Sequence, residues 1–333
     1  RRVLLGAVGL GLVAAGLFAT ARATWWLVVA QIVEGIAMGA WQAAAMPALV
    51  EHHPRNDPRR AAVVGSAATT GGAALGPVVA GLLAQYAFWP QVLPFLVEAV
   101  ALAGSLALLS AAVPADLQPD RKLRFARPSV PRPIRRPFFL ATSAAFLAWG
   151  VASLFLSLMP RYVMDLLGSS NLAVIGGLAA ILLACSAVAA LAGERLDPVR
   201  AIAVGLSAMV AASAALVVAS GIRSLPVMLG ASVLAGVGLG LAFRGSLAEI
   251  NRIAPEGRKG AVMASYYLGV YAGTAIPVIG IGVGALWVGL GSAVRGFAVV
   301  TGVLCLLNLI LVAAGQRREA AHPQAYVRGP ADH

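Results

Sequence analysis

The hydrophobic positions of the chain fall into long runs that short polar segments separate. About ten runs occur, near residues 3–21, 25–50, 61–85, 94–113, 137–160, 172–192, 199–220, 226–248, 261–284 and 295–315. A helix of about 20 residues spans the ~30 Å hydrocarbon core of a bilayer, where the backbone has to satisfy its own hydrogen bonds. The pattern therefore predicts an all-α membrane protein with ten membrane-spanning helices in this chain.

Composition agrees with lipid as the main solvent of the chain. Of the 333 residues, 60% are hydrophobic and 11% are charged, whereas an ordinary soluble domain has roughly 45–50% and about 25%. Cys185 and Cys305 lie inside apolar runs without the spacing of a metal or redox pair, so we expect small packed side chains. No H-E-x-x-H or G-x-S-x-G pattern occurs. The sequence predicts no enzyme, no catalytic residue, no metal and no cofactor.

Basic residues concentrate on one side of the predicted membrane. When alternate connections are assigned to opposite sides, 20 of the 25 Lys and Arg residues fall on one side and 4 on the other, with Arg244 inside a run. By the positive-inside rule, the start, the connection 114–136 and the tail are cytoplasmic. The net charge of +12 then needs no nucleic-acid partner. Because arginine far outnumbers lysine, as in GC-rich bacteria, we expect a multi-pass protein of a bacterial cytoplasmic membrane.

The chain carries an internal repeat. Gly35, Gly39 and Pro54 recur as Gly236, Gly240 and Pro255, and Pro77 recurs as Pro277. The repeat predicts two homologous halves, 1–113 and 137–315, which the basic, proline-rich linker 114–136 joins and a tail, 316–333, follows. The runs 137–160 and 172–192 have no counterparts before Arg1. We therefore expect a complete protein of twelve helices, in two halves of six, whose first two helices precede this chain.

Three groups of residues match motifs of known transporters. Arg1, Arg2 and Leu5 match the end of a G-x-x-x-D-R-x-G-R-R-x-x-L loop, and Gly193, Asp197 and Arg200 form a decayed second copy. In a stretch that usually reads R-x-x-Q-G-x-G, Gln31 replaces the arginine and Glu34 the glutamine. Gly72, Gly76, Pro77 and Gly81 match G-x-x-x-G-P-x-x-G-G, with Ala80 in place of one glycine. In order, spacing and sidedness these motifs resemble those of the major facilitator superfamily, over essentially the whole chain.

The resemblance implies a fold and an activity. In this family two six-helix halves rock around a site near the middle of the membrane. The last motif resembles that of the antiporter branch, which implies proton-coupled efflux of a drug-like or amphipathic solute. The expected partners are a small-molecule substrate, protons and membrane lipid, and we expect a monomer. Two alternatives stay open: uptake or facilitated diffusion of a small metabolite, and a sensor or scaffold that transports nothing.

The glycine and proline motif also has a physical interpretation of its own. Glycines spaced by four residues, such as Gly72 and Gly76, leave one stripe of a helix without side chains, so a neighbouring helix can approach closely. Pro77 frees a backbone carbonyl and bends the helix. The run 61–85 is therefore a candidate gate, and ordinary close packing is the alternative.

Polar side chains inside the apolar runs are the other candidate site residues, because burying them in lipid is costly. Gln31, Glu34, Met38 and Gln42 share one helical face, with Trp41 beside them. Tyr267, Tyr271 and Thr274 form a similar stripe, and Arg244 lies nearer the cytoplasmic end. We expect both stripes to line a wet cavity; packing is the alternative for the tyrosines and snorkelling for Arg244. Glu98 lies close to an outer helix end, and we expect it at the interface.

Glu34 is the leading candidate for proton coupling or cation recognition. It lies roughly 14 Å below the outer surface and Arg244 roughly 27 Å, at ~1.5 Å per residue, so we expect no direct ion pair between them. A carboxylate at this depth loses solvation, which suits a group that binds and releases a proton. The alternative is a buried carboxylic acid that only donates a hydrogen bond to a neighbouring helix.

The charge asymmetry predicts the orientation of the chain in the membrane. We expect a reporter fused after residue 125 to behave as cytoplasmic and one fused near Trp89 to behave as external. Paired alkaline phosphatase and fluorescent-protein fusions measure this directly. The opposite pattern of activities would invert every connection assigned above.

Overall fold

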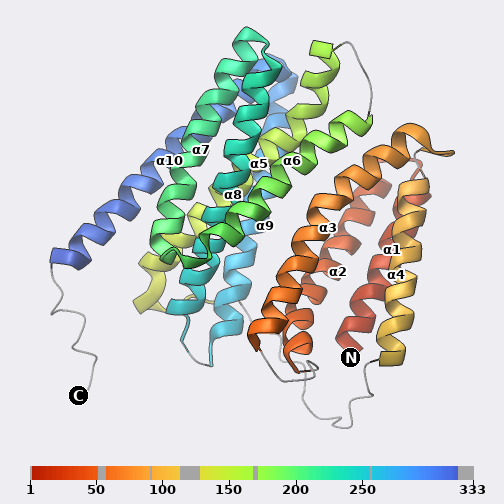
Figure 1. Ribbon diagram of the computed structural model, residues 1–333, viewed down its shortest axis with the longest axis horizontal. Helices are drawn as coiled ribbons and strands as arrows, with labels where there is room; N and C mark the ends of the chain where they lie inside the picture. Colours follow the sequence, from red (N-terminus) through yellow and green to blue (C-terminus); the bar gives the residue numbers. More distant parts are fainter. Residues whose placement is uncertain are drawn as a thin grey trace. The chain divides into compact units, whose positions relative to one another are not determined.

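The computed structural model describes residues 2–51, 58–90, 92–112, 128–167, 172–255 and 257–321. Within these residues the chain forms ten α-helices and two short 3-10 turns, and no strand (Figure 1). The helices are α1 (Arg2–Ala19), α2 (Thr24–Glu51), α3 (Pro58–Tyr86), α4 (Leu93–Ala112), α5 (Arg135–Leu167), α6 (Leu172–Ala192), α7 (Pro198–Ile222), α8 (Leu225–Ile253), α9 (Lys259–Val288) and α10 (Leu290–Ala321). The turns are η1 (Arg132–Ile134) and η2 (Gly193–Arg195). The prediction of an all-α protein is confirmed.

Each predicted run coincides with one helix, and several helices extend beyond the apolar residues. α8 continues to Ile253 and α10 to Ala321, because the polar residues that follow each run are themselves good helix formers. Gly289 alone separates α9 from α10, with a φ of 79° that favours glycine. Seven helices in the described part are long and apolar enough, by length and composition, to cross a membrane.

The chain divides into two compact units. The first consists of residues 1–124 together with 171–180, and the second of residues 125–170 and 181–333. The first nine residues of α6 therefore cluster with the first unit, although the repeat assigns the whole of α6 to the second half. The division of the protein into two functional halves stays a prediction.

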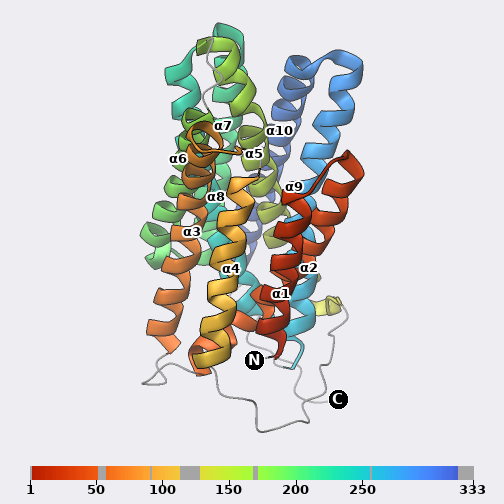
Figure 2. The same ribbon diagram turned by 90° about the vertical axis from the view of Figure 1, so that its right-hand side faces the viewer.

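In the first unit α1 lies between α2 and α4, and α3 contacts both of those helices (Figure 2). The buried residues of α1 include Ala7, Ala14 and Ala15, and those of α2 include Ala30 and Ala37. Such small side chains allow the backbones of membrane helices to approach closely, which increases dispersion contacts where no hydrophobic effect drives association.

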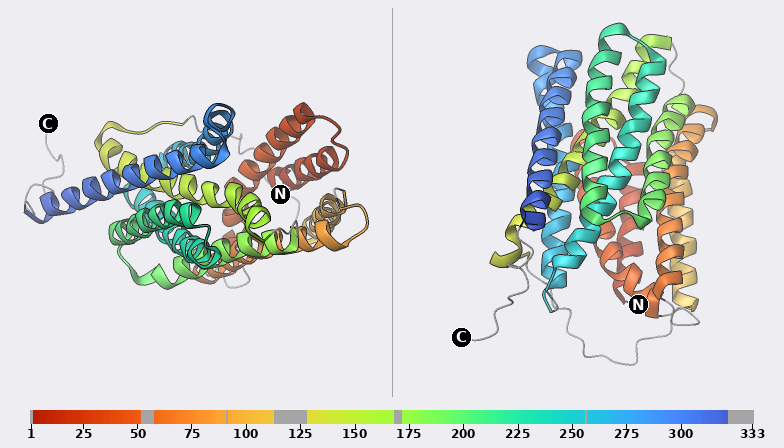
Figure 3. Two further views of the ribbon diagram at one scale, coloured as in Figure 1. Left: turned by 90° about the horizontal axis from the view of Figure 1, so that it is seen from above. Right: turned by 60° about the vertical axis from the view of Figure 1, so that its left-hand side comes forward.

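In the second unit the most extensive contact joins α7 and α8, which lie side by side (Figure 3). α5 packs against α8 and α9, and α10 packs against α7, α9 and α5. The inner face of α10 contains Thr301, Cys305 and Asn308, all buried, whereas aliphatic side chains such as Leu307 and Ile310 are more than half exposed. This asymmetry is what a helix with one lipid-facing side requires.

Two repeated glycine pairs have different surroundings in the two units. On α8, a Cβ at Gly236 would meet the carbonyl oxygen of Leu182, and one at Gly240 would overlap that of Ser186, so α6 and α8 are in backbone contact. On α2, a Cβ at the matching Gly35 or Gly39 would meet no atom within 4 Å. The sequence repeat therefore does not carry the same packing in both units.

The contact between α6 and α8 predicts a strong effect of one added methyl group. We expect Gly240→Ala to lower the free energy of unfolding by about 1–3 kcal/mol, because the two backbones have to separate. The matched control is Gly230→Ala on the same helix, where a Cβ meets nothing within 4 Å and the gain in helix propensity preserves or raises stability. Thermal unfolding in detergent compares them, and equal midpoints would contradict the contact.

Candidate functional site

The polar stripe of α2 lies beside the buried face of that helix. Ala30 and Ala37 are buried, whereas Gln31, Met38, Gln42 and Trp41 are exposed. Glu34 lies between these two groups around the helix and is half-buried. The five predicted residues therefore lie on one side of α2. Unlike the side that contains Ala30 and Ala37, this side is not packed against the described residues. Whether that side lines a cavity stays a prediction.

The carboxylate of Glu34 has no hydrogen bond or ion pair among the described residues. Glu98 on α4 lies within the range of electrostatic repulsion from Glu34. Glu98 is exposed. The sequence predicted an interfacial position for it and no relation to Glu34. No sequence signal predicts this relation, because the whole of α3 separates α2 from α4 along the chain.

The glycine and proline motif of α3 makes a close helix contact at its C-terminal end. α3 continues through Pro77, whose carbonyl oxygen, with Gly81, would collide with a Cβ at Gly176 of α6. All three residues belong to the first unit. A Cβ at Gly72 or Gly76 would meet no atom within 4 Å. Close approach, predicted from Gly72 and Gly76, occurs instead at Pro77, the residue after Gly76, and at Gly81.

The tyrosine stripe of α9 belongs to a longer row of aromatic rings in the second unit. Tyr271 lies 6.3 Å from Tyr267 and Tyr267 lies 5.4 Å from Tyr266, centroid to centroid. The row continues to Phe243 of α8, 6.4 Å from Tyr266, and to Trp149 of α5, 5.9 Å from Phe243. We call these five residues the aromatic row. Thr274 lies beyond it, and its hydroxyl points to the carbonyl of Val270 at a long 3.5 Å.

Arg244 is fixed to the end of another helix. Its Nη1 donates to the carbonyl oxygen of Gly193 at 2.7 Å, and its Nη2 donates to that of Glu194 at 2.8 Å. The last carbonyls of a helix lack the usual partners within the helix. The guanidinium supplies a donor to Glu194 and a second donor to Gly193, whose carbonyl also accepts from the backbone N–H of Leu196 at 2.9 Å. The structure thus brings together Arg244 and Gly193, and it indicates a structural clamp between α8 and the α6–α7 corner.

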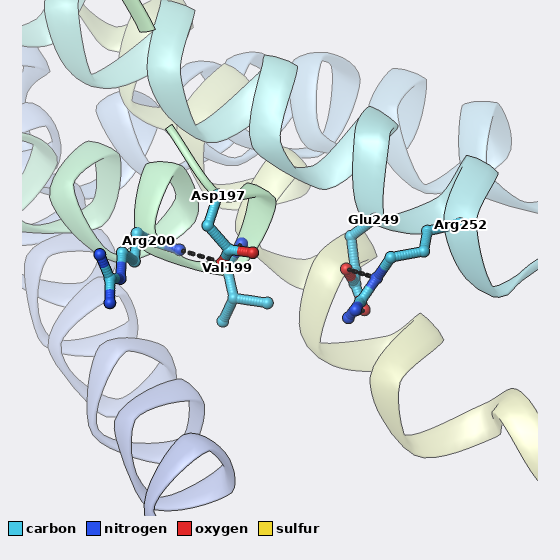
Figure 4. A network of polar contacts seen from close by, with 5 residues as sticks. All are labelled: Asp197, Val199, Arg200, Glu249 and Arg252. Atoms are coloured by element: carbon cyan, nitrogen blue, oxygen red, sulfur yellow. Dashed lines mark hydrogen bonds and ion pairs between the residues drawn. The ribbon is translucent and has the colours of Figure 1, made fainter. Parts of the chain in front are cut away.

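The rest of the decayed loop motif caps α7. One carboxylate oxygen of Asp197 accepts hydrogen bonds from the backbone N–H groups of Val199, at 3.0 Å, and Arg200, at 3.3 Å (Figure 4). Pro198 occupies the first helical position, where no N–H is needed. The side chain of Arg200 is exposed. Of the first copy, Arg2 begins α1 and is exposed, and Arg1 lies outside the described residues.

An ion pair near the C-terminal end of α8, between a buried carboxylate and an exposed arginine, was not predicted from the sequence. Glu249 is 5% exposed, and its two carboxylate oxygens accept hydrogen bonds from Arg252 at 2.8 and 2.9 Å (Figure 4). The apolar run was taken to end at 248, one residue before this pair. The spacing of three residues between an acid and a base near a helix end is the signal that would have predicted it.

Comparisons with known proteins give one family match and several similar folds. The sequence pattern of the Major Facilitator Superfamily matches residues 1–278. No curated protein matches the chain. Among solved structures, the chain is similar to a bacterial homolog of the human lysosomal transporter Spinster, inward-facing and occupied, with a TM-score of 0.66 and 16% identity over 95% of this chain and 82% of that one.

Two further solved structures are similar to the chain. The human organic anion transporter MFSD10 (TETRAN) has a TM-score of 0.64 and 19% identity, over 94% of this chain and 76% of that one. A bacterial metal transporter has a TM-score of 0.57 and 20% identity, over 94% of this chain and 84% of that one. At these identities the likeness shows a shared fold alone.

The Arg244 clamp predicts a loss of stability when the guanidinium is removed. We expect Arg244→Gln to lower the free energy of unfolding by about 1.5–3 kcal/mol, because two carbonyl groups lose charged donors. Arg195→Gln, at an exposed arginine of the same turn, is the matched control and changes stability little. Thermal unfolding in detergent measures both. Equal midpoints for the two variants would show that Arg244 does not hold this corner.

Proposed function

The chain belongs to the major facilitator superfamily, and from that premise we propose that it is a proton-coupled exporter of drug-like or amphipathic small molecules. Membership makes it a multi-pass membrane protein and a secondary transporter of small molecules, not an enzyme. We further propose that it acts as a monomer in a bacterial cytoplasmic membrane, with the linker 114–136 and the tail in the cytoplasm. The two halves would alternate access to a shared solute.

The observation that carries the proposal is the half-buried Glu34 on the polar side of α2. An ionised carboxylate in an apolar helix is costly without a partner, and none of the described residues offers one. A proton supplied from one side of the membrane and released to the other satisfies this need during a transport cycle. Gln31, Met38, Trp41 and Gln42 would then line the path of the solute on the same side of α2.

The proposed direction of transport, export, is supported by features of α3. Its Gly72, Gly76, Pro77 and Gly81 resemble the motif of the antiporter branch, and the contact of Pro77 and Gly81 with Gly176 supports a gating role, because such close packing allows a small shift to open or seal a path. Export of the solute in exchange for incoming protons is therefore favoured over uptake. The aromatic row, which includes Tyr267 and Tyr271, suits an amphipathic solute.

The proposal predicts that Glu34→Gln abolishes coupling while preserving the fold. Glutamine keeps the shape and most hydrogen bonding of glutamate but does not ionise. In inverted membrane vesicles, where export appears as uptake, we expect an uncharged dye such as Nile red or N-phenyl-1-naphthylamine to accumulate when a proton gradient is imposed. Accumulation by Glu34→Gln should fall to the level of vesicles without the protein, at equal amounts of inserted protein.

The matched control is Glu194→Gln, which removes an exposed carboxylate outside the α2 stripe and keeps the backbone carbonyl that Arg244 binds. It should retain gradient-driven accumulation. Full accumulation by Glu34→Gln would remove this residue from the mechanism. Solute movement that ignores the gradient would indicate facilitated diffusion instead, and the absence of movement for every probe would indicate a sensor or scaffold.

A further inference from the structure

The aromatic row presents ring surfaces of graded accessibility. Tyr266, at its centre, is fully buried, and its hydroxyl forms a hydrogen bond with the hydroxyl of Ser246 at 2.8 Å. Trp149, Phe243 and Tyr267 are partly exposed, and Tyr271 is 48% exposed. Tyr266 therefore anchors the row, while its neighbours keep part of their surface free for another molecule.

One polar group of the row lacks a partner. The indole Nε1 of Trp149 is buried, and no acceptor lies within hydrogen-bond distance among the described residues. A buried N–H without an acceptor costs about 1–3 kcal/mol, and native structures rarely tolerate one without a reason. The rings of Trp149 and Phe243 pack edge to face, with centroids 5.9 Å apart and an interplanar angle of 86°, so the residue with the unpaired donor belongs to the aromatic row.

The charges around the row narrow the class of ligand. None of its five members carries a charge, and Arg244, next to Phe243 in the chain, already uses both Nη atoms on backbone carbonyls. An anion would find no free cation among these residues, and a cation would find no carboxylate. Flat rings stack well against aromatic faces, and the free N–H of Trp149 calls for an acceptor atom.

We propose that the aromatic row binds an uncharged, planar aromatic solute whose acceptor atom takes the hydrogen bond of Trp149 Nε1. The ring of the solute lies against Phe243 and Tyr267, and Trp149 sets its orientation. This inference deepens the proposed export function by naming the class of solute, and it assigns Trp149, which the sequence did not single out, to the binding of that solute.

The test compares two probes of nearly the same shape. Quinoline carries a ring nitrogen that accepts a hydrogen bond and is uncharged at pH 7.5, whereas naphthalene has no acceptor. Equilibrium dialysis of the purified full chain in detergent, corrected for empty micelles, gives the dissociation constant of each. We expect quinoline to bind about two- to tenfold more tightly than naphthalene, the range of a single hydrogen bond.

Three variants separate the donor from the ring surface. Trp149→Phe should abolish the preference for quinoline, and Phe243→Leu should weaken both probes while preserving their ratio. Trp26→Phe is the matched control, because Trp26 also has a buried Nε1 without a partner but lies in the first unit, outside the row; it should change neither constant. Thermal unfolding verifies that each variant is folded.

The outcomes distinguish this inference from the proposed function, because binding is measured without a membrane or a gradient. Equal affinity for the two probes in the unchanged chain, or a preference that survives in Trp149→Phe, would overturn the role of Trp149. If Trp149→Phe does not fold, unchanged affinities in Phe243→Leu would overturn the site by themselves. Normal binding together with failed export of every dye would instead overturn only the proposed export.

Discussion

The structure depends on one constraint: a backbone inside hydrocarbon has to form its own hydrogen bonds, because no water is present to supply them. The constraint makes every long apolar run a helix and leaves the helices to associate through close packing. Gly205 of α7 against Ala242 of α8, and Gly240 of α8 against Ser186 of α6, show how the second unit achieves this. Small residues matter here because larger side chains would hold the backbones apart.

The same constraint explains where polar side chains are found. A helix leaves carbonyl groups without partners at its end and N–H groups at its beginning, and the α6–α7 corner satisfies both kinds with side chains. Arg244 donates to carbonyl oxygens after α6, and Asp197 accepts from the first N–H groups of α7. Most of the decayed loop motif therefore survives as helix capping, which needs only a donor or acceptor of the right reach.

Other polar side chains have no hydrogen-bond partner among the described residues. Among the described residues, no hydrogen-bond partner is found for the half-buried carboxylate of Glu34 in the first unit or for the buried indole N–H of Trp149 in the second. Within the same described part of the chain, a partner is also lacking for buried polar atoms of Trp26, Thr142, Ser213 and Asn308. The buried Glu249 with the exposed Arg252, and the buried Ser246 with the buried Tyr266, show that other polar side chains of this protein are satisfied. Unsatisfied groups of opposite kinds, an acid and a donor, are what a coupled transporter needs for a proton and a solute.

The sequence by itself determined the helices, because a run of about 20 apolar residues has only one stable backbone conformation in lipid. It also determined the family and the members of each polar stripe, which follow from spacing along one helix. Only the tertiary structure decided which helices meet. Gly236 and Gly240 contact α6, whereas a Cβ at the matching Gly35 or Gly39 would meet no described atom within 4 Å. Arg244 reaches Gly193, and Trp149 contacts Phe243, which stacks on Tyr266 beside Tyr267. These contacts join residues far apart in sequence, and their geometry is set by how whole helices pack, which no local pattern records.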